Sequence, residues 1–269
     1  MTRKISELRC KFLELGPDTV AAVIMEPLVG AALGCVGAVP GYLKAVQQVC
    51  QQYGSLLILD EVMCGMGRTG TLHAWEQEGV VPDLQTLGKG LAGGYQPASA
   101  LLVGKRVADV MERQGKTFTH GHTYQNHPVV CAAALEVQRI IRAEKLLNNV
   151  KTQGTYLERL LRQGLSAHSH VGDIRGRGLF WAVEFVRDKT TKQPFHPDMQ
   201  VALQVQKRAQ SPPYKLLVYH GQGCAGNGRG DHVMIMPAYN SNAHVIEMMV
   251  SSLVAAVRDV FDELDRALS

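Results

Sequence analysis

The chain has 269 residues, of which 46% are hydrophobic and 19% are charged, enough apolar material for one large domain or two modest ones. The 27 glycines and the balanced composition fit an α/β enzyme better than a disordered or fibrous protein. The net charge of +4 comes from 28 basic and 24 acidic residues mixed along the chain. So small a surplus, without a basic run, gives no reason to expect nucleic acid or an anionic membrane as a partner.

The six cysteines contain no C-x-x-C spacing and lie mostly in apolar runs, so we expect free, buried thiols in a reducing compartment. Glu7 and Arg9 interrupt the start of the chain before any apolar run forms, which argues against a signal peptide. Residues 20–39 are apolar enough to raise the question of a membrane span, but Glu26 and Pro27 lie inside them. We therefore expect a cytoplasmic protein with no membrane segment.

The first predicted elements are a strand, a helix and a second strand. Residues 20–25 form a short apolar run that is typical of a strand covered on both faces. Pro40 opens a helix that Gly54 ends, and residues 56–59 form another apolar strand that ends at Asp60. This order predicts a parallel pair of strands joined by a right-handed crossover.

The remaining elements suggest two domains. We expect a helical turn or two at 71–78 and strands at 84–87 and 98–103. A long helix follows from Pro128, and then a second helix that Gly154 and Gly164 interrupt or end. Beyond them we expect strands at 179–186, 216–219 and 233–236, with a helix at 198–209. A closing helix is capped by Asn242. We place the boundary near Glu144, which gives a partial large domain, mainly of parallel sheet, at 1–144 and a smaller α/β domain at 145–269.

Asp60 is the first candidate site residue, because it ends an apolar parallel strand. In open α/β sheets, ligands bind in the crevice beyond the carboxyl ends of the strands. Taken alone, the same carboxylate is explained equally well as a solvated loop residue or a helix cap.

Lys89 is the second candidate, and it lies between Gly88 and Gly90 in a glycine-rich stretch. Flanking glycines leave space for a bulky planar partner to approach the backbone. A lysine in a partly dry crevice can lose its proton and attack a carbonyl, as Schiff-base chemistry requires. A phosphate-contacting loop lysine is the alternative, but the Walker pattern fails because Asp83 stands where its first glycine belongs and no Ser or Thr follows Lys89.

Three further motifs give weaker signals. Residues 65–70 match G-x-G-x-x-G after a strand, which keeps a nicotinamide-dependent dehydrogenase as a minor alternative, although no acid ends a following strand as that fold would want. Residues 175–178 are too short for an RNA-binding arginine–glycine box and favour a turn before a strand, with an arginine facing a cleft. The two His-x-His pairs, at 120–122 and 168–170, have no neighbouring ligands in metal-binding spacing, so no metal is expected.

Residues 59–70, followed by Gly88-Lys89-Gly90, resemble the class III aminotransferases, which depend on pyridoxal 5'-phosphate and share a fold type I architecture. The resemblance continues through the motifs at 25–27, 122–124, 127–128 and 175–179, in the family's order and over nearly the whole chain. It implies a transferase that moves an amino group from an amino acid or amine donor to a 2-oxo acid acceptor.

The resemblance also assigns roles to single residues. Lys89 would hold the cofactor as a Schiff base and then move the proton, Asp60 would pair with the protonated pyridine nitrogen, and Val62 would pack against one face of the ring. Thr123 would bind the phosphate of the neighbouring subunit's cofactor, which implies a homodimer. Arg175 would receive a substrate carboxylate. Glu26 matches a glutamate near the cofactor without a sharp role.

The chain departs from the family pattern at three places. Met63 stands where several members have a glutamine, and Ala31 aligns with a glutamate of the ornithine-type enzymes, so an omega-amino acid or amine is favoured over ornithine. No segment of the chain matches the family's Gly-Ser phosphate loop or the aromatic residue that stacks on the ring. An alternative is therefore a truncated, non-catalytic relative that pairs with a full-length subunit.

Overall fold

The computed structural model describes residues 1–115 and 118–268, which form two compact units. The first unit contains Met1–Leu28, Gly37–Gly67 and Thr71–Lys145. The second contains Val29–Val36, Arg68–Gly70 and the chain from Leu146 onward. Two short excursions of the first half of the sequence thus belong to the second unit.

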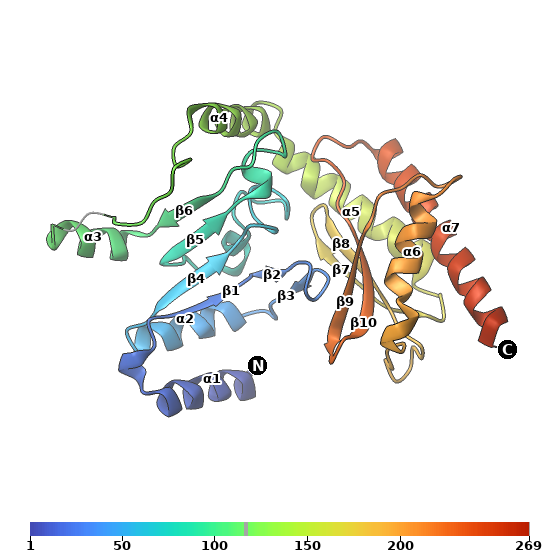
Figure 1. Ribbon diagram of the computed structural model, residues 1–269, viewed down its shortest axis with the longest axis horizontal. Coiled ribbons are helices and arrows are strands. Elements are labelled where there is room, and N and C mark those ends of the chain that lie inside the picture. The colour runs from blue at the N-terminus through green and yellow to red at the C-terminus, as the bar shows by residue number, and fades with distance from the viewer. Residues whose placement is uncertain (116–117, 269) are drawn as a thin grey trace. The chain divides into compact units, whose positions relative to one another are not determined.

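The first unit is built on a four-stranded sheet, visible in Figure 1, with the strand order β1-β4-β5-β6. The strands are β1 (Ala22–Met25), β4 (Leu56–Asp60), β5 (Leu84–Leu87) and β6 (Ala100–Val103). β1 and β4 are parallel, as are β4 and β5, whereas β5 and β6 are antiparallel. The predicted parallel strand–helix–strand unit is confirmed, and the sheet is mainly parallel.

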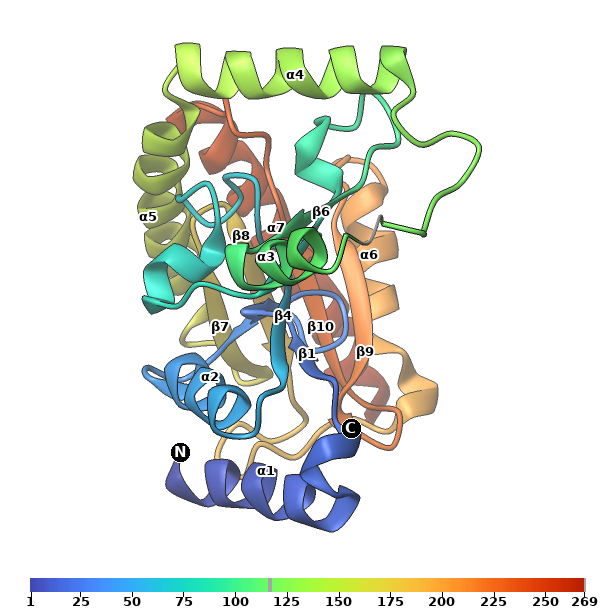
Figure 2. The same cartoon turned by 90° about the vertical axis from the view of Figure 1, so that its left-hand side faces the viewer.

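Helices α1 (Thr2–Leu15), α2 (Tyr42–Gln52), α3 (Lys105–Arg113) and α4 (Pro128–Ala143) also belong to this unit. α2 packs on β4 and α1 packs on α2, as Figure 2 shows. The sequence analysis missed α1, because only Ile5 and Phe12 are buried on it and lysine–glutamate pairs occupy its exposed side. The buried core of this layer consists of Ile5, Phe12, Leu43, Val46, Val49, Cys50, Leu57, Leu59 and Val80.

Short elements complete the first half of the chain. They are the 3-10 helices η1 (Pro17–Thr19), η2 (Ala74–Glu78) and η3 (Lys89–Leu91) and the paired two-residue strands β2 (Leu28–Val29) and β3 (Val36–Gly37).

The second unit is built on an antiparallel sheet with the order β7-β8-β10-β9. The strands are β7 (Val171–Arg177), β8 (Phe180–Phe185), β9 (Tyr219–Gly226) and β10 (Arg229–Ile235). The helical elements are α5 (Leu146–Leu165), η4 (Pro197–Met199), α6 (Val201–Gln210) and α7 (Ala243–Leu268). The three α-helices pack on one another or on the sheet, and apolar side chains from all of them share one core with β7, β8 and β10.

The interruption of a helix at Gly154 and Gly164 was predicted wrongly, because both glycines lie inside α5. Each fills a site with no room for a side chain. A Cβ on Gly154 would lie 2.3 Å from the carbonyl oxygen of Gly178, and one on Gly164 would lie 2.5 Å from Val254. Tertiary packing selects these glycines, and it outweighs their poor helix propensity.

Two other local predictions have mixed outcomes. The strand expected at 216–219 in fact begins at Tyr219 and runs on to Gly226. Asn242 is confirmed as a helix cap, since its Oδ1 accepts a hydrogen bond of 3.0 Å from the backbone N–H of Val245. β7 was not predicted as a strand, because Gly172 and Gly176 weaken its pattern.

All six cysteines are free, but only Cys35, Cys50 and Cys64 are buried, so the expectation of uniformly buried thiols is wrong for Cys10 and Cys131. Across the residues that the structure describes, the helices are each too short or too polar to cross a lipid bilayer.

Candidate active site

Three of the residues singled out from the sequence lie at the same edge of the first unit's sheet. β1, β4 and β5 run parallel, so their carboxyl ends meet at one edge. Glu26 follows β1 directly, Asp60 is the last residue of β4, and Lys89 comes two residues after β5. The register sets Met25 opposite Leu59 and Asp60 opposite Thr86, which brings the three strand ends level.

Lys89 begins the short helix η3 and has a φ of 40°, in the left-handed region that side chains rarely adopt. Its side chain is exposed, and no hydrogen bond or ion pair joins it to any other residue described at 1–115 or 118–268. A long amine held in an unusual backbone conformation without an internal partner is available to a ligand.

Val62 lies against the residue before this lysine. A Cβ placed on Gly88 would be 3.2 Å from Cγ1 of Val62, so the absence of a side chain at Gly88 lets the two segments approach closely. The valine side chain, predicted to contact a cofactor ring, is therefore next to the backbone that carries Lys89.

The carboxylate of Asp60 is half-buried and oriented by the turn that follows it. Its Oδ1 accepts a hydrogen bond of 2.9 Å from the backbone N–H of Val62. The turn is held to the next strand, because the N–H of Glu61 donates to the carbonyl of Thr86 at 3.0 Å. Asp60 is thus an anchored acceptor at the strand ends.

Thr86 is a candidate site residue that the sequence analysis missed. It sits opposite Asp60 in the register, and its hydroxyl oxygen is buried without a hydrogen-bond partner in the described part of the chain. Buried hydroxyls are normally hydrogen-bonded, so an unpaired hydroxyl at a strand end indicates that a bound ligand supplies the missing hydrogen-bond partner. The only signal in the sequence was the position of Thr86 three residues before Lys89.

Glu61, by contrast, has a structural role. It is fully buried, and its two carboxylate oxygens accept hydrogen bonds of 2.8 Å from the backbone N–H groups of Ala74 and Trp75. Burial raises the pKa of this carboxyl group. Its bonds join the two ends of the segment that contains residues 65–70, which form turns, and the next helical element is the 3-10 helix η2. The G-x-G-x-x-G match therefore lacks the helix that a dinucleotide fingerprint opens.

Thr123 lies in an exposed turn between α3 and α4. The backbone N–H of Tyr124 donates to Nδ1 of His122 at 3.2 Å, which orders this turn locally. Within the part of the chain that the structure describes, no hydrogen bond joins Thr123 to the three strand ends. Its predicted role, binding the phosphate of a neighbouring subunit's cofactor, stays a prediction.

Arg175 lies inside β7, so the turn predicted around it is wrong. Its guanidinium is half-buried and bound by the second unit itself. Nη1 donates to Glu184 and, at 3.2 Å, to Asp173, while Nε and Nη2 donate at 2.7 and 2.6 Å to the carbonyls of Gly34 and Leu33. These carboxylates raise the pKa of Arg175 against the opposing effect of burial. Its predicted role as the receiver of a substrate carboxylate gains no support from this geometry.

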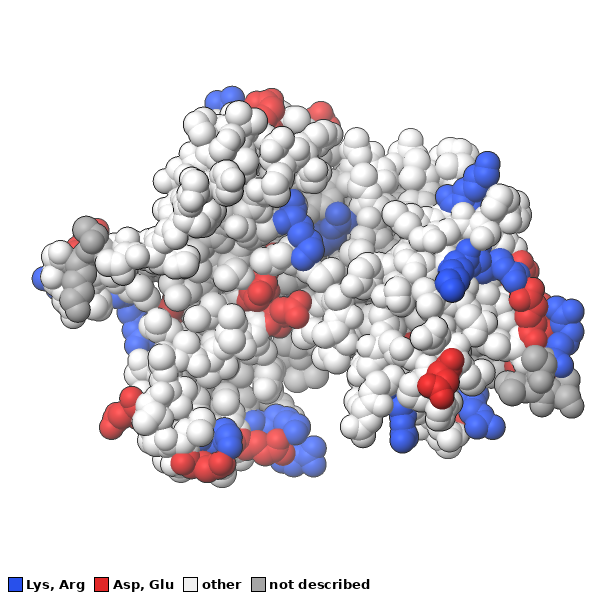
Figure 3. All heavy atoms as spheres, viewed as in Figure 1, with Lys and Arg blue, Asp and Glu red and all other residues white. Residues whose placement is uncertain are grey.

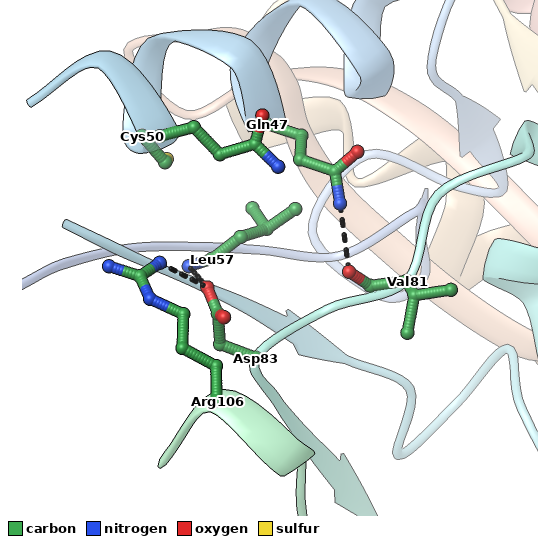
Figure 4. A pocket seen from close by; sticks show the side chains of 7 residues that line it. Gln47, Cys50, Leu57, Val81, Asp83 and Arg106 are labelled. Carbon is green, nitrogen blue, oxygen red and sulfur yellow. Dashed lines mark hydrogen bonds and ion pairs between the residues drawn. The ribbon is translucent and has the colours of Figure 1, made fainter. Parts of the chain in front are cut away.

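A separate hollow of about 210 Å³ lies at the other end of β4 and is shown in Figure 4. Asp83 accepts there from the N–H of Leu57 at 2.8 Å and from Arg106 at 3.4 Å. The amide of Gln47 donates to the carbonyl of Val81 at 2.8 Å. Burial and the nearby Asp83 raise the pKa of Cys50, which keeps this thiol protonated and unreactive. Gln47, Asp83 and Arg106 are thus hydrogen-bonded to other residues of this hollow.

Figure 3 shows basic and acidic side chains scattered among neutral atoms over one face of the molecule. On that face, among the described residues, basic and acidic side chains lie in small separate groups.

The family model described as Aminotransferase class-III matches residues 1–257. The chain belongs to this family. An aminotransferase of Gibberella zeae is 54% identical over 251 residues, which are 93% of this chain and 49% of that protein. The predicted fold type I architecture is also confirmed, since the similar solved structures are transaminases.

Among those structures, a transaminase from the marine bacterium Virgibacillus superposes with a TM-score of 0.91 at 30% identity, over 98% of this chain and 58% of that one. An amine transaminase from an uncultivated Pseudomonas species, in its PLP-bound internal aldimine form, superposes with a TM-score of 0.86 at 34% identity. The match covers 95% of this chain and 56% of that one. The chain spans about half the length of the curated relatives it matches.

Proposed function

We propose that this chain carries the lysine-centred site of a pyridoxal-phosphate-dependent aminotransferase, which moves an amino group from an amino acid or amine to a 2-oxo acid. The observation that supports it best is the position of Lys89, whose amine has no partner among the described residues and which lies at the same sheet edge as the oriented carboxylate of Asp60. Family membership supplies the reaction class.

The residues present fit this cofactor in three respects. The Lys89 amine has no competing partner in the described chain, the hydroxyl of Thr86 is buried without a hydrogen bond, and the glycine before Lys89 removes a side chain that would crowd Val62. When bound, pyridoxal phosphate supplies an aldehyde that condenses with an amine and a ring that withdraws electrons.

Each residue then has a defined task. Lys89 Nζ would hold the cofactor covalently and would be the group that moves a proton, and Asp60 would hold a proton on the ring nitrogen by charge pairing. Val62 would pack against the ring, and Glu26 lies at the same strand edge, where it would be near the cofactor. Thr123 would contact the phosphate in a second copy of the chain, so a homodimer is part of the proposal.

The test is to treat the chain with pyridoxal phosphate, reduce the adduct with borohydride, and map it by mass spectrometry. We expect the mass increase on the peptide that contains Lys89. Lys89→Arg should lose it, whereas Lys105→Arg is the matched control, because Lys105 is an exposed lysine paired with Asp109. An adduct spread over several surface lysines, unchanged in Lys89→Arg, would contradict the proposal.

A second candidate is a non-catalytic chain that pairs with a longer subunit. It is favoured by the half-length match to relatives and by exposed apolar side chains on the first unit, among them Leu101, Leu102 and Val103 of β6. Size-exclusion chromatography and a transamination assay on the pure chain distinguish the two. Robust turnover by the chain alone would exclude this second candidate.

A further inference from the structure

Residues 29–36 form a loop that is held by the second unit's sheet. The loop closes on itself, because the N–H groups of Gly34 and Cys35 donate to the carbonyl of Gly30 at 2.7 and 3.4 Å. Gly34 and Cys35 have φ values of 70° and 56°, so both are in the left-handed region. A loop with two such residues needs outside contacts to remain in one conformation.

Arg175 supplies two of these contacts. Its Nε donates to the carbonyl of Gly34 at 2.7 Å and its Nη2 to the carbonyl of Leu33 at 2.6 Å. Both are charge-assisted bonds from a rigid, planar group whose side chain is only 16% exposed. Glu184, on the neighbouring strand, and Asp173 pair with Nη1 and fix the orientation of the guanidinium.

His232 supplies the surface on which the loop rests. This β10 residue is fully buried, and it pairs with Glu184 on one side and with Gly221 on the other. A Cβ on Gly34 would lie 2.5 Å from the imidazole Cδ2, and one on Gly221 would lie 2.2 Å from Nε2. The ring is therefore enclosed by two glycines, one of which belongs to the loop.

We propose that Arg175 is a positioning residue that holds residues 29–36 on the β7–β8–β10–β9 sheet, with the ring of His232 as the packing surface under Gly34. The donor count argues against the alternative role of receiving a substrate carboxylate. The guanidinium of Arg175 has five N–H donors. The bonds described above use one at Nε, two at Nη1 and one at Nη2, which leaves a single N–H at Nη2. A bidentate carboxylate needs two adjacent ones.

The consequence for the site follows from the chain itself. Val29 comes three residues after Glu26, so anchoring this loop restricts the segment that leaves the carboxyl end of β1. The catalytic part of this inference rests on the proposed aminotransferase function, whereas the anchoring of the loop does not.

Hydrogen–deuterium exchange on the 269-residue chain tests the anchoring. Arg175→Lys keeps the charge but loses the planar fork, so the amides of Gly34 and Cys35 should exchange about tenfold faster. Arg139→Lys is the control, because Arg139 pairs with Glu136 on the exposed side of α4. Unchanged exchange in the loop of Arg175→Lys would overturn the proposal.

A glycine pair tests the contact with His232. Gly34→Ala and Gly223→Ala both place a side chain at a left-handed φ, of 70° and 98°. Only the first meets the imidazole ring, since no atom of the described residues beyond its chain neighbours lies within 4 Å of a Cβ at Gly223. We expect faster loop exchange in Gly34→Ala alone. Equal behaviour of the two variants would show that the ring does not support the loop.

Activity supplies the last readout, with 4-aminobutyrate and butylamine as amino donors that differ by one carboxylate. A positioning role predicts that Arg175→Lys lowers kcat/KM for both donors by the same factor. A selective loss with 4-aminobutyrate would instead assign Arg175 to the substrate carboxylate and overturn the proposal. If the unaltered chain forms no borohydride-reducible adduct on Lys89, the proposed function fails while the exchange result still decides the anchoring.

Discussion

Lys89 and Thr86 show how single residues at the strand ends depart from ordinary packing. Lys89 has a φ of 40° and Thr86 has a buried hydroxyl without a partner among the described residues. Each feature costs free energy in the folded chain, of the order of 1–3 kcal/mol. Unfavourable features of this kind are typical of functional sites, where a bound ligand satisfies the polar groups that the folded chain leaves unpaired.

Thr86 therefore gives a prediction about cofactor affinity. Thr86→Val removes the hydroxyl and keeps the shape, so the free energy of unfolding should stay equal or rise by up to about 1 kcal/mol without cofactor. If the hydroxyl bonds to pyridoxal phosphate, its Kd should rise by about fivefold to tenfold. Urea unfolding and a fluorescence titration measure the two quantities.

The matched control is Thr152→Val on the exposed side of α5, which should leave the Kd unchanged. A fall in stability together with an unaltered Kd for Thr86→Val would show that the hydroxyl has a structural partner instead.

At the scale of the element, α5 is a helix whose sequence contains two glycines because its neighbours need them. Gly154 approaches the backbone of Gly178, and Gly164 approaches the side chain of Val254. A backbone carbonyl cannot move without shifting the β7–β8 turn, whereas a valine side chain can rotate. The two glycines should therefore tolerate substitution to different degrees.

Gly154→Ala should destabilise the chain by about 2 kcal/mol or more, although alanine favours a free helix by about 1 kcal/mol over glycine. The reason is the 2.3 Å approach of the new Cβ to the Gly178 oxygen. Urea unfolding checks this, with the exposed Thr152→Ala as the control that should change by only a few tenths of a kcal/mol. A stabilised Gly154→Ala variant would mean that α5 and the turn do not touch.

At the scale of the whole molecule, the chain consists of two units with separate cores. The second unit closes its core between an antiparallel sheet and three helices. The first unit leaves Ile24 of β1 and the side chains of β6 exposed, the former at 63%. A domain boundary near Glu144 stays a prediction about which segment folds by itself, and expression of 145–269 alone would test it.

The buried imidazole of the second unit predicts a pH dependence of stability. Burial and the nearby charge of Arg175 lower the pKa of His232 to about 4, below its value of 6.5 in an unfolded chain. Because the unfolded chain binds the proton more readily, this group's contribution is fully present above pH 6.5 and is lost as the pH falls towards 4. Between pH 7 and pH 5 the loss should be about 2 kcal/mol.

Urea unfolding at the two pH values measures this loss. His232→Asn should remove the contribution of His232 to the pH dependence of the unfolding free energy. His168, whose pKa burial also lowers, contributes in the same direction in both proteins, so the difference between them isolates His232. Identical slopes for the two proteins would contradict the assignment.

The sequence by itself determined the family and the local chemistry. Apolar runs and a lysine between glycines are local signals. The parallel pair of strands followed from the order strand, helix, strand, because a crossover connection admits few arrangements. Asp60 was expected at a strand end, and the structure adds that Glu26 and Lys89 follow the neighbouring strands at the same edge.

Only the tertiary structure decided the tasks of residues whose partners are distant in the sequence. Arg175 is bound to carbonyls some 140 residues away, at separations of 141 and 142, and Gly154 is required by a turn that follows a different element. Hydrophobic periodicity reports which face of an element is buried, but it carries no information about which atom occupies the space beyond that face. That information arises when packing brings the two segments together.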